Sequence, residues 1–232
     1  MVIVDKDLGE IRLVKNARAK RIIVRKKDGY LQLTYPPSVS MSFVEKTIRD
    51  MKPRLMSLVE KKTTRILFTP DIEFNTFSFT LKLITGISTK NYYMSLKEGV
   101  LSISCPADIN YNDSTVQSTI KGFVEKALRY EANRLFPAKV KSFAERYGFK
   151  YTELKINKSR TRWGSCSSKK TINLSFYCML LPEYLVDFVI LHELCHTVEM
   201  NHGERFWQLL DKVSDDKAKE LTKALKDHKT ML

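Results

Sequence analysis

The sequence predicts an α+β protein in which duplicated strand-strand-helix units over residues 1–115 precede a second domain, residues 116–232, that contains a HExxH helix. Two observations support this expectation. One strand-rich stretch superimposes on another after a shift of about 70 residues. A mostly apolar helical pattern that follows Pro182 contains the letters HELCH. Hydrophobic residues make up 43% of the 232 residues, which is enough to form a buried core.

The two copies of the repeat are residues 10–37 and residues 80–107, which align without a gap. Each copy is typical of extended segments joined by a tight turn. The turns fall at Asp28-Gly29 and at Glu98-Gly99. Apolar residues at helical spacing follow each copy. They are Val44, Ile48, Met51 and Leu55 after the first copy, and Val116, Ile120, Phe123 and Ala127 after the second. We interpret the pair as a duplicated scaffold; the alternative is a chance similarity of two hairpins.

The helix after the second copy is expected to continue to Tyr147, with Gly148 as its stop signal and Pro137 as a candidate kink. Two extended stretches, residues 154–163 and 171–177, then flank a Gly/Ser/Lys turn and predict a hairpin.

Pro182 opens a core helix that is expected to continue to about Met200. Asn201 and Gly203 are suited to its C-terminal cap. An amphipathic helix around residues 206–213 and a polar last helix complete the predicted elements.

The net charge of +14 is unevenly distributed. Residues 1–65 carry roughly +9 and residues 136–181 roughly +8, whereas residues 66–135 are close to neutral and residues 182–232 carry roughly −3. The basic blocks fit either solvated lysines or attraction to a polyanion, such as nucleic acid or a phosphorylated substrate. No nucleic-acid module motif supports the second interpretation.

The chain is expected to be a soluble cytoplasmic protein that does not enter a membrane. Its first residues do not resemble a signal peptide, because charges interrupt the apolar run. The longest apolar stretch, residues 184–194, is too short and too polar to span a bilayer. The four cysteines form no CxxC pair, which argues against a disulfide framework. Cys195 is expected to pack in the core and not to bind a metal.

Three of the four histidines lie in the stretch HELCHTVEMNHGERFW, residues 192–207. Residues four apart on a helix point to nearly the same side, so His192 and His196 can present two imidazoles to one metal ion. Glu193 lies beside them as the candidate general base, which is the HExxH arrangement of zinc enzymes. A catalytic zinc site needs a third protein ligand and an open position, and His202 follows where the helix is expected to end.

The full spacing HExxHxxxxxH is also that of the metzincin peptidases. Their glycine between the second and third histidines is replaced here by Glu199, so we place the turn at Asn201-His202-Gly203. Glu199 is either an acceptor for an imidazole N–H or a surface charge. Burying two histidines and a glutamate in an apolar helix is costly without a partner, so Zn2+ is the expected cofactor.

Together with the upstream stretches RWGSCSSKKTINLSF and LPEYLVDFVILHE, the histidine motif resembles the YgjP-like family of predicted zinc metallopeptidases, relatives of the SprT and WLM groups. The match is specific over residues 155–210 and looser in the strand-rich N-terminal region. The resemblance implies that residues 116–232 form a zincin-like metallopeptidase domain, in which a strand near residues 171–176 lines the cleft. It also implies that the helix supplies His192, Glu193 and His196, and that the following turn supplies His202.

The expected reaction needs a nucleophile, a base and a donor. Zinc held by three neutral imidazoles lowers the pKa of its water toward about 7, and Glu193 takes the proton as the water attacks a carbonyl or phosphoryl centre. A donor must also face the negative charge that develops. Arg162 is the first candidate for this catalytic role, with a structural salt bridge as its alternative, and Tyr177 and Arg160 come after it.

We weigh three functions. A zinc endopeptidase acting on a peptide or protein would be favoured by an exposed edge strand near Thr171, where a peptide can add as a further strand. A metal-dependent phosphohydrolase acting on nucleotides would bind phosphate through the basic residues of the hairpin. These residues are Lys158, Arg160, Arg162, Lys169 and Lys170. A binding module with a structural zinc would not need Glu193. The metallopeptidase is the prediction, with the phosphohydrolase as the alternative.

Overall fold

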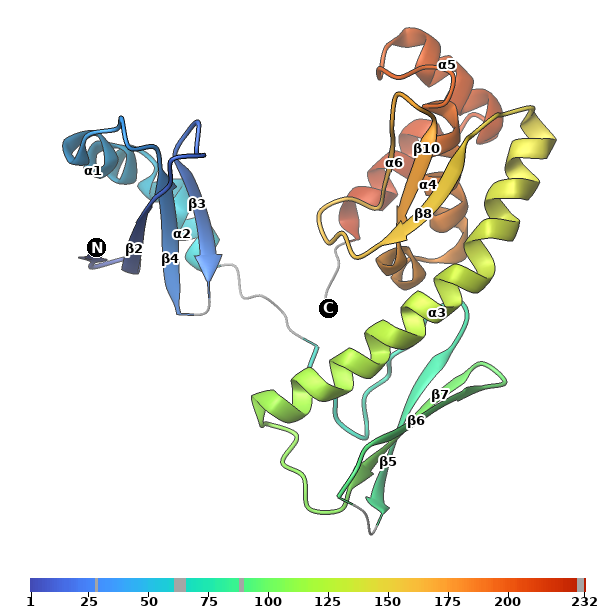
Figure 1. Ribbon diagram of the computed structural model, residues 1–232, viewed down its shortest axis with the longest axis horizontal. Coiled ribbons are helices and arrows are strands. Elements are labelled where there is room, and N and C mark those ends of the chain that lie inside the picture. Colours follow the sequence, from blue (N-terminus) through green and yellow to red (C-terminus); the bar gives the residue numbers. More distant parts are fainter. Residues whose placement is uncertain (28, 61–65, 88–89, 229–231) are drawn as a thin grey trace. The chain divides into compact units, whose positions relative to one another are not determined.

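The computed structural model describes residues 1–27, 29–60, 66–87, 90–228 and 232. These residues form a mixed α+β fold with six α-helices and three small sheets (Figure 1). The chain divides into two compact units, Met1–Thr64 and Arg65–Leu232, and each is described by itself. Within the described residues, none of the helices combines the length and the apolar character that crossing a bilayer requires.

The first unit packs a four-stranded sheet against two helices. Its elements are β1 (Val2–Asp5), β2 (Gly9–Lys15), β3 (Ile23–Lys27), β4 (Tyr30–Tyr35), α1 (Met41–Asp50) and α2 (Lys52–Glu60). In the sheet order β1-β2-β4-β3, β2 is parallel to β4 and β3 is antiparallel to it. Alternate residues of β2 and β4 are buried in one cluster with apolar residues of the two helices, as in a sheet with one covered face.

The helical pattern after the first repeat forms two helices where one continuous helix was predicted. Ser40 caps α1 by accepting a hydrogen bond from the Phe43 N–H, and Met51 separates α1 from α2. Pro53 lies just beyond this break, and a proline has no N–H for an uninterrupted helix and its ring crowds the preceding turn. The predicted apolar face is otherwise confirmed, since Val44, Ile48 and Leu55 are buried.

The first sheet of the second unit repeats the arrangement of β2, β4 and β3. Its strands are β5 (Thr80–Ile87), β6 (Tyr93–Lys97) and β7 (Val100–Pro106), with β5 parallel and β6 antiparallel to β7. The register agrees with the shift found in the sequence, since Leu13 pairs with Leu33 and Leu83 with Ile103. Asp28 of the first predicted turn lies outside the described residues. The shared topology is observed, whereas duplication as its origin remains a prediction.

The β5–β7 sheet shares its hydrophobic core with the rest of the second unit. Leu101 and Ile103 belong to the same buried cluster as Ile120 and Val124 of the helix that follows. The expected division at residue 115 therefore lies inside the second compact unit. As a boundary between scaffold and catalytic regions it remains a prediction.

Helix α3 (Ser114–Tyr147) is a single helix of 34 residues. Asp113 caps its start, and Gly148, with a φ of 73°, ends it as predicted. The helix continues through Pro137, so the proline does not break it, whereas a kink at this position remains a prediction. The loss of one backbone hydrogen bond at the proline is offset by Phe136 and Val140, which are both fully buried.

A sheet of order β8-β10-β9 follows α3. Its strands are β8 (Glu153–Asn157), β9 (Gly164–Cys166) and β10 (Thr171–Ser175). A hairpin forms between β9 and β10, but β9 lies in the stretch predicted as the turn, and the predicted first strand of the hairpin is β8, which is parallel to β10. The stretch predicted over residues 154–163 stops being a strand at Asn157, because the Asn157 carboxamide accepts the Ser159 N–H at 2.9 Å and turns the chain away.

Thr171 itself lies in the central strand of this sheet, and the strands on either side of it, β8 and β9, are the edges. A strand at residues 171–175 is present, but β9 lies between it and the open edge and contacts the histidine helix more closely. The stretch after β10 is a 3-10 helix, η1 (Phe176–Leu180), because the Ser175 hydroxyl accepts the Tyr177 N–H.

The histidine motif begins in α4 (Glu183–Cys195), a helix buried over most of its surface. Helix α4 ends before the expected Met200, because the N–H groups of Thr197 and Val198 donate to carbonyls three residues back and not four. Asn201 and Gly203 therefore do not cap α4, which corrects that expectation. Gly203 instead precedes α5 (Glu204–Val213), and α6 (Ala218–Asp227) is the polar last helix predicted.

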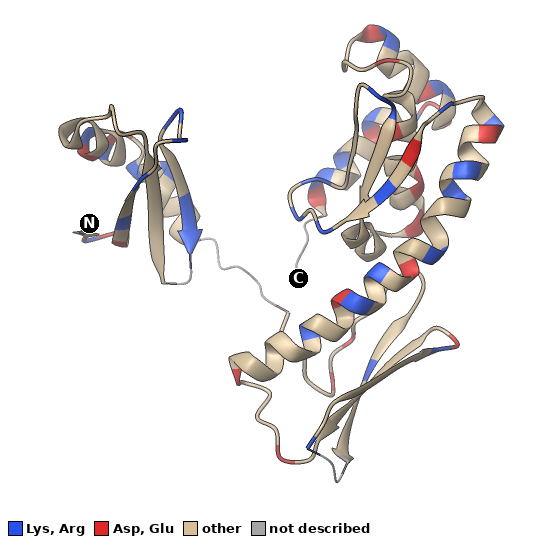
Figure 2. Cartoon of the chain, viewed as in Figure 1, with Lys and Arg blue, Asp and Glu red and all other residues tan. Residues whose placement is uncertain are grey.

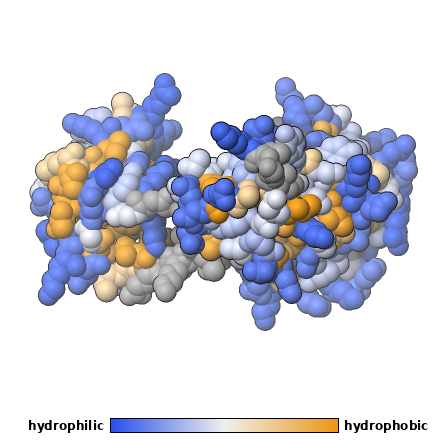
Figure 3. Space-filling model, turned by 90° about the horizontal axis from the view of Figure 1, so that it is seen from below, coloured by the Kyte–Doolittle hydropathy of each residue, from blue (hydrophilic) through white to orange (hydrophobic). Residues whose placement is uncertain are grey.

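Charged and apolar side chains are mixed on the surface of both units. Figure 2 shows Lys and Arg on β3 and at intervals along α3, where Asp and Glu lie between them. On the face drawn in Figure 3, hydrophobic residues form small groups among hydrophilic ones. This distribution is typical of a solvated surface and favours the first interpretation of the net charge.

Candidate metal centre

Helix α4 presents two imidazoles on one side at its C-terminal end. The Nε2 atoms of His192 and His196 are 3.2 Å apart, and His202 brings its Nε2 to within 3.1 Å of the same His192 atom. All three rings can offer one ligand atom each, and these atoms lie within 4.8 Å of one another. The structure therefore brings together the three histidines that the spacing predicted.

The turn before α5 carries His202. The Gly203 N–H donates to the Asn201 carbonyl at 2.8 Å, which closes a tight turn around His202 at the predicted place. Phe206, fully buried one turn into α5, lies against all three imidazoles, with ring centroids between 4.5 and 5.0 Å away. The aromatic ring of Phe206 thus fixes the position of the loop relative to α4.

The contacts among the three rings are better satisfied by a cation than by protons. A neutral imidazole nitrogen either donates or accepts, so His192 Nε2 cannot donate to one neighbour while it accepts from the other. Two nitrogens bound tetrahedrally to one zinc ion lie about 3.3 Å apart, close to the two distances observed. The donor set therefore fits a metal ion.

The protonation states also suit a metal. Burial, followed by the charges of His196 and His202, lowers the pKa of His192 to about 4, and burial likewise lowers the pKa of His196. Both imidazoles are neutral near pH 7, which is the form that coordinates a metal ion.

A carbonyl orients the second imidazole. His196 Nδ1 lies 3.0 Å from the backbone oxygen of Glu199, so the ring carries its proton on Nδ1 and turns Nε2 toward the other histidines. Glu199 thus accepts from an imidazole N–H, which is one of the two roles weighed from the sequence, but it does so through its main chain.

Glu193 follows His192 on α4 and lies against the edge strand β9. Its side chain is buried, and Oε2 has no hydrogen-bond partner among the described residues. Burial raises the pKa of the Glu193 carboxyl to about 8. A buried carboxyl without a partner is unusual, and it indicates a site whose remaining polar groups come from a ligand.

Gly164 of β9 makes room for this carboxyl. A Cβ atom at Gly164 would lie 2.6 Å from both Cγ and Oε1 of Glu193, closer than any ordinary contact. The glycine is therefore required by a side chain of α4, since its backbone has no left-handed φ.

A polar cavity of about 340 Å³ opens on β9. Arg162 and Gly164 line it, with the carboxamide of Asn157 and the hydroxyls of Ser159, Thr161, Ser165 and Ser175. Arg162 is exposed, and only its backbone N–H makes a described hydrogen bond, to Ser159 Oγ at 3.2 Å. The structural salt bridge weighed for Arg162 is absent among the described residues.

A model of the YgjP-like metallopeptidase domain matches residues 20–228, nearly the whole chain. The chain belongs to the YgjP-like metallopeptidase family. It is therefore a metal-dependent hydrolase, and its family acts on peptide or protein substrates. The crystal structure of the metallopeptidase zymogen abylysin of Pyrococcus abyssi is a distant neighbour at 22% identity and a TM-score of 0.35, covering 38% of this chain and 90% of that one. No curated protein matches the chain.

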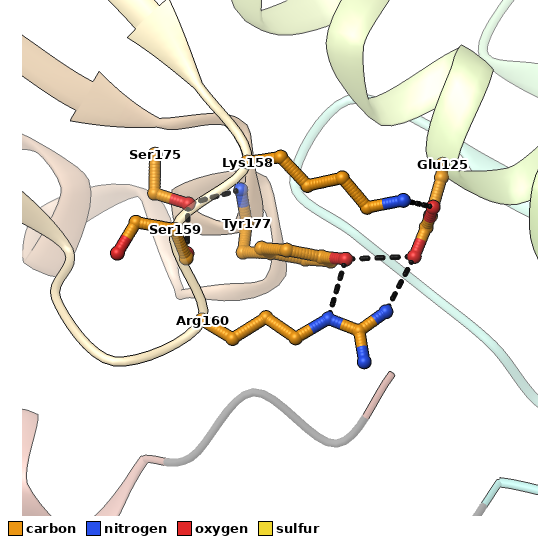
Figure 4. A network of polar contacts seen from close by, with 6 residues as sticks. All are labelled: Glu125, Lys158, Ser159, Arg160, Ser175 and Tyr177. Atoms are coloured by element: carbon orange, nitrogen blue, oxygen red, sulfur yellow. Dashed lines mark hydrogen bonds and ion pairs between the residues drawn. The ribbon is translucent and has the colours of Figure 1, made fainter. Parts of the chain in front are cut away.

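In this YgjP-like protein, Tyr177 and Arg160 form hydrogen bonds with Glu125 of α3 (Figure 4). The Tyr177 hydroxyl donates to Glu125 Oε1 at 2.7 Å, and the Arg160 guanidinium donates both to that carboxylate and to the Tyr177 oxygen. Lys158 pairs with the other Glu125 oxygen. Because Tyr177 is fully buried, the network is structural and not a source of donors for a substrate.

Three residues of the YgjP-like site were missed in the sequence. Gly164 stood in the quoted RWGSC stretch, but only the packing of β9 against α4 shows that Glu193 needs it. Phe206 was assigned to an apolar helix face and not to the histidines. Glu125, which lies 33 residues or more from its partners Lys158 and Arg160, gave no signal in the sequence.

Proposed function

We propose that the protein is a zinc-dependent peptidase in which His192, His196 and His202 hold the ion and Glu193 is the general base. The convergence of three imidazole nitrogens, together with the buried and unpartnered carboxyl oxygen of the residue after His192, is the observation that carries this proposal. Three neutral nitrogen ligands suit zinc, which takes nitrogen donors in catalytic sites and keeps a fourth position open. When bound, zinc supplies a Lewis acid and a water of lowered pKa.

Glu193 is suited to receive a proton. Its carboxyl is buried beside His192, and a cation nearby favours the ionised form that a base requires. Once protonated, the same carboxyl can donate to the leaving amine, which completes peptide hydrolysis. The low polarity of its surroundings, which raises its pKa, also brings that pKa closer to neutral pH, where a base and an acid are both effective.

The edge strand β9 supports a peptide substrate. Hydrogen bonds join Trp163 to Ser175 and Ser167 to Thr171, so that in the antiparallel pattern Gly164 and Cys166 turn their N–H and C=O groups away from β10. These groups can bind an extended peptide as an additional strand. The peptide would then lie along β9, next to Glu193.

Arg162 as a donor to the developing negative charge remains a prediction, and the cavity it lines favours another role. Nothing in the comparisons supports a nucleotide substrate or a nucleic-acid partner, and two of the five basic residues invoked for phosphate, Lys158 and Arg160, are paired with Glu125. We therefore do not propose the phosphohydrolase.

The test is metal content and cleavage of an unfolded protein such as casein, measured for wild type, Glu193→Gln and His196→Ala. We expect Glu193→Gln to keep zinc and to lose about 10²–10⁴-fold in turnover, and His196→Ala to lose zinc. Glu199→Gln is the matched control, since only its backbone contacts His196. Unchanged turnover in Glu193→Gln contradicts the base, and full zinc occupancy in His196→Ala contradicts the ligand set.

A further inference from the structure

The cavity beside β9 is lined by polar side chains, and among its described lining residues the charged one is Arg162, a cation. It contains four hydroxyls, one carboxamide and one guanidinium, and no carboxylate lines it within the described part of the chain. An arginine side chain alone provides five N–H groups in a planar fork that matches the geometry of a carboxylate. The chemistry of the lining therefore selects an anion.

Local hydrogen bonds use the hydroxyl of Ser175 and leave the hydroxyl of Ser159 able to donate into the cavity. Ser159 Oγ accepts the Arg162 N–H at 3.2 Å, so its own hydroxyl proton is not used in that contact. The Ser175 hydroxyl is committed, since it donates to the Ser159 carbonyl at 2.6 Å and accepts the Tyr177 N–H. This bond fixes the loop over the cavity while Ser159 remains able to donate.

Charge pairing within the loop singles out Arg162. The segment 158–163 carries three cations, and two of them, Lys158 and Arg160, form ion pairs with the single carboxylate of Glu125 (Figure 4). Arg162 makes no ion pair with any described residue, and it is the cation that lines the cavity. The Glu125 network thus holds the loop in place without using the charge of Arg162.

The cavity adjoins the proposed catalytic carboxyl. Gly164 lines the cavity and also approaches Glu193 so closely that no Cβ fits between them. Ser165, the next residue of β9, lines the cavity as well. A peptide bound along β9 would therefore place part of its length at the cavity while another part lies beside Glu193.

We propose that this cavity is a substrate subsite for a carboxylate, supplied by an acidic side chain or by the C-terminus of the peptide, and that Arg162 determines this specificity. The proposal rests on the proposed peptidase function. It gives Arg162 a positioning role toward one part of the substrate, in place of a donor role toward the reacting atoms. The two roles differ in the measurements they affect.

The experiment compares fluorescently labelled peptides that differ only in the anionic group. One pair has glutamate or glutamine at a single internal position, scanned along an otherwise neutral sequence, and a second pair has a free or an amidated C-terminus. Binding is measured by fluorescence anisotropy on the inactive Glu193→Gln protein, and kcat/KM is measured on the active protein. The variants are Arg162→Gln and, as a matched control, Arg146→Gln, an exposed arginine of α3 outside the cavity.

We expect wild type and Arg146→Gln to prefer the carboxylate form at one position by about tenfold, and Arg162→Gln to lose this preference with little change for the amide form. The pair that shows the preference identifies the source of the carboxylate. Equal binding of both forms by the Glu193→Gln protein that retains Arg162 overturns the proposal. So does a uniform fall in kcat for all peptides in Arg162→Gln, which would instead indicate the donor role. Because binding is measured on inactive protein, a failure of the peptidase function itself would appear separately.

Discussion

Replacing Gly164 with alanine tests whether the edge strand and the catalytic helix are fitted to each other. The new Cβ would lie 2.6 Å from Cγ and Oε1 of Glu193 and 2.8 Å from Cδ, whereas ordinary carbon contacts are about 3.5–4.0 Å. The two groups must therefore separate by about 1 Å. β9 is held by its hydrogen bonds to β10, so Glu193 is the group expected to move.

A shift of about 1 Å in a catalytic group lowers turnover by about 100-fold, which corresponds to ~2.7 kcal/mol of activation free energy. Overpacking a buried contact also destabilises the fold by about 1–3 kcal/mol. The three histidines are not displaced by the added methyl group, so zinc content should be unchanged. We expect a stable, zinc-loaded Gly164→Ala protein with little activity.

The assay combines casein cleavage, zinc content and thermal unfolding of Gly164→Ala. Gly122→Ala is the control, because a Cβ at this position on α3 meets nothing within 4 Å and alanine favours a helix by about 1 kcal/mol. Gly122→Ala should keep wild-type activity. A Gly164→Ala protein with wild-type turnover and stability would refute the close fit between β9 and Glu193.

Two further predictions concern the metal and the Glu125 network. Removing zinc with a chelator should lower the stability of wild type by about 4 kcal/mol when the metal had been supplied at a thousand times its Kd, and it should leave His196→Ala unaffected in thermal unfolding. Burial opposes the charge of Glu125, but Lys158, Tyr177 and Arg160 outweigh it and lower the pKa of Glu125. Its charge therefore stabilises the fold above pH ~4.3, and this contribution is lost as pH falls through the lower folded pKa. Glu125→Gln should cost about 2 kcal/mol at pH 7, with melting temperatures that converge with wild type below pH 4; a constant difference across this range would contradict the assignment.

The sequence predicted features that depend on local spacing. The histidines four apart, the stop at Gly148 and the apolar face of residues 44–55 follow from helical periodicity and terminal preferences, and the structure has all three. The parallel registers of β2 with β4 and of β5 with β7 agree with the repeat, although pairing partners could not be derived from it.

The sequence could not predict features that depend on distant contacts. The end of α4 at Cys195 results from the hydrogen bonds of the turn at residues 197–198. The free energies of this turn and of a continued helix differ little, so the sequence does not decide between them. The position of β9 at the sheet edge follows from the parallel pairing of β8 with β10, which the hairpin pattern alone does not contain. The requirement for glycine at position 164 arises only when α4 packs beneath the sheet.

The length of α3 limits how the chain can be shortened. At 1.5 Å per residue its 34 residues extend about 50 Å, and it contacts β7 near one end and β8, η1 and α4 farther along (Figure 1). A fragment that began at residue 116 would leave Ile120, Val124 and Ala127 facing water where β7 had covered them. Such a fragment would expose an apolar helix face and tend to self-associate. The smallest piece that retains an intact peptidase is thus expected to begin between the two compact units and to include the β5–β7 sheet.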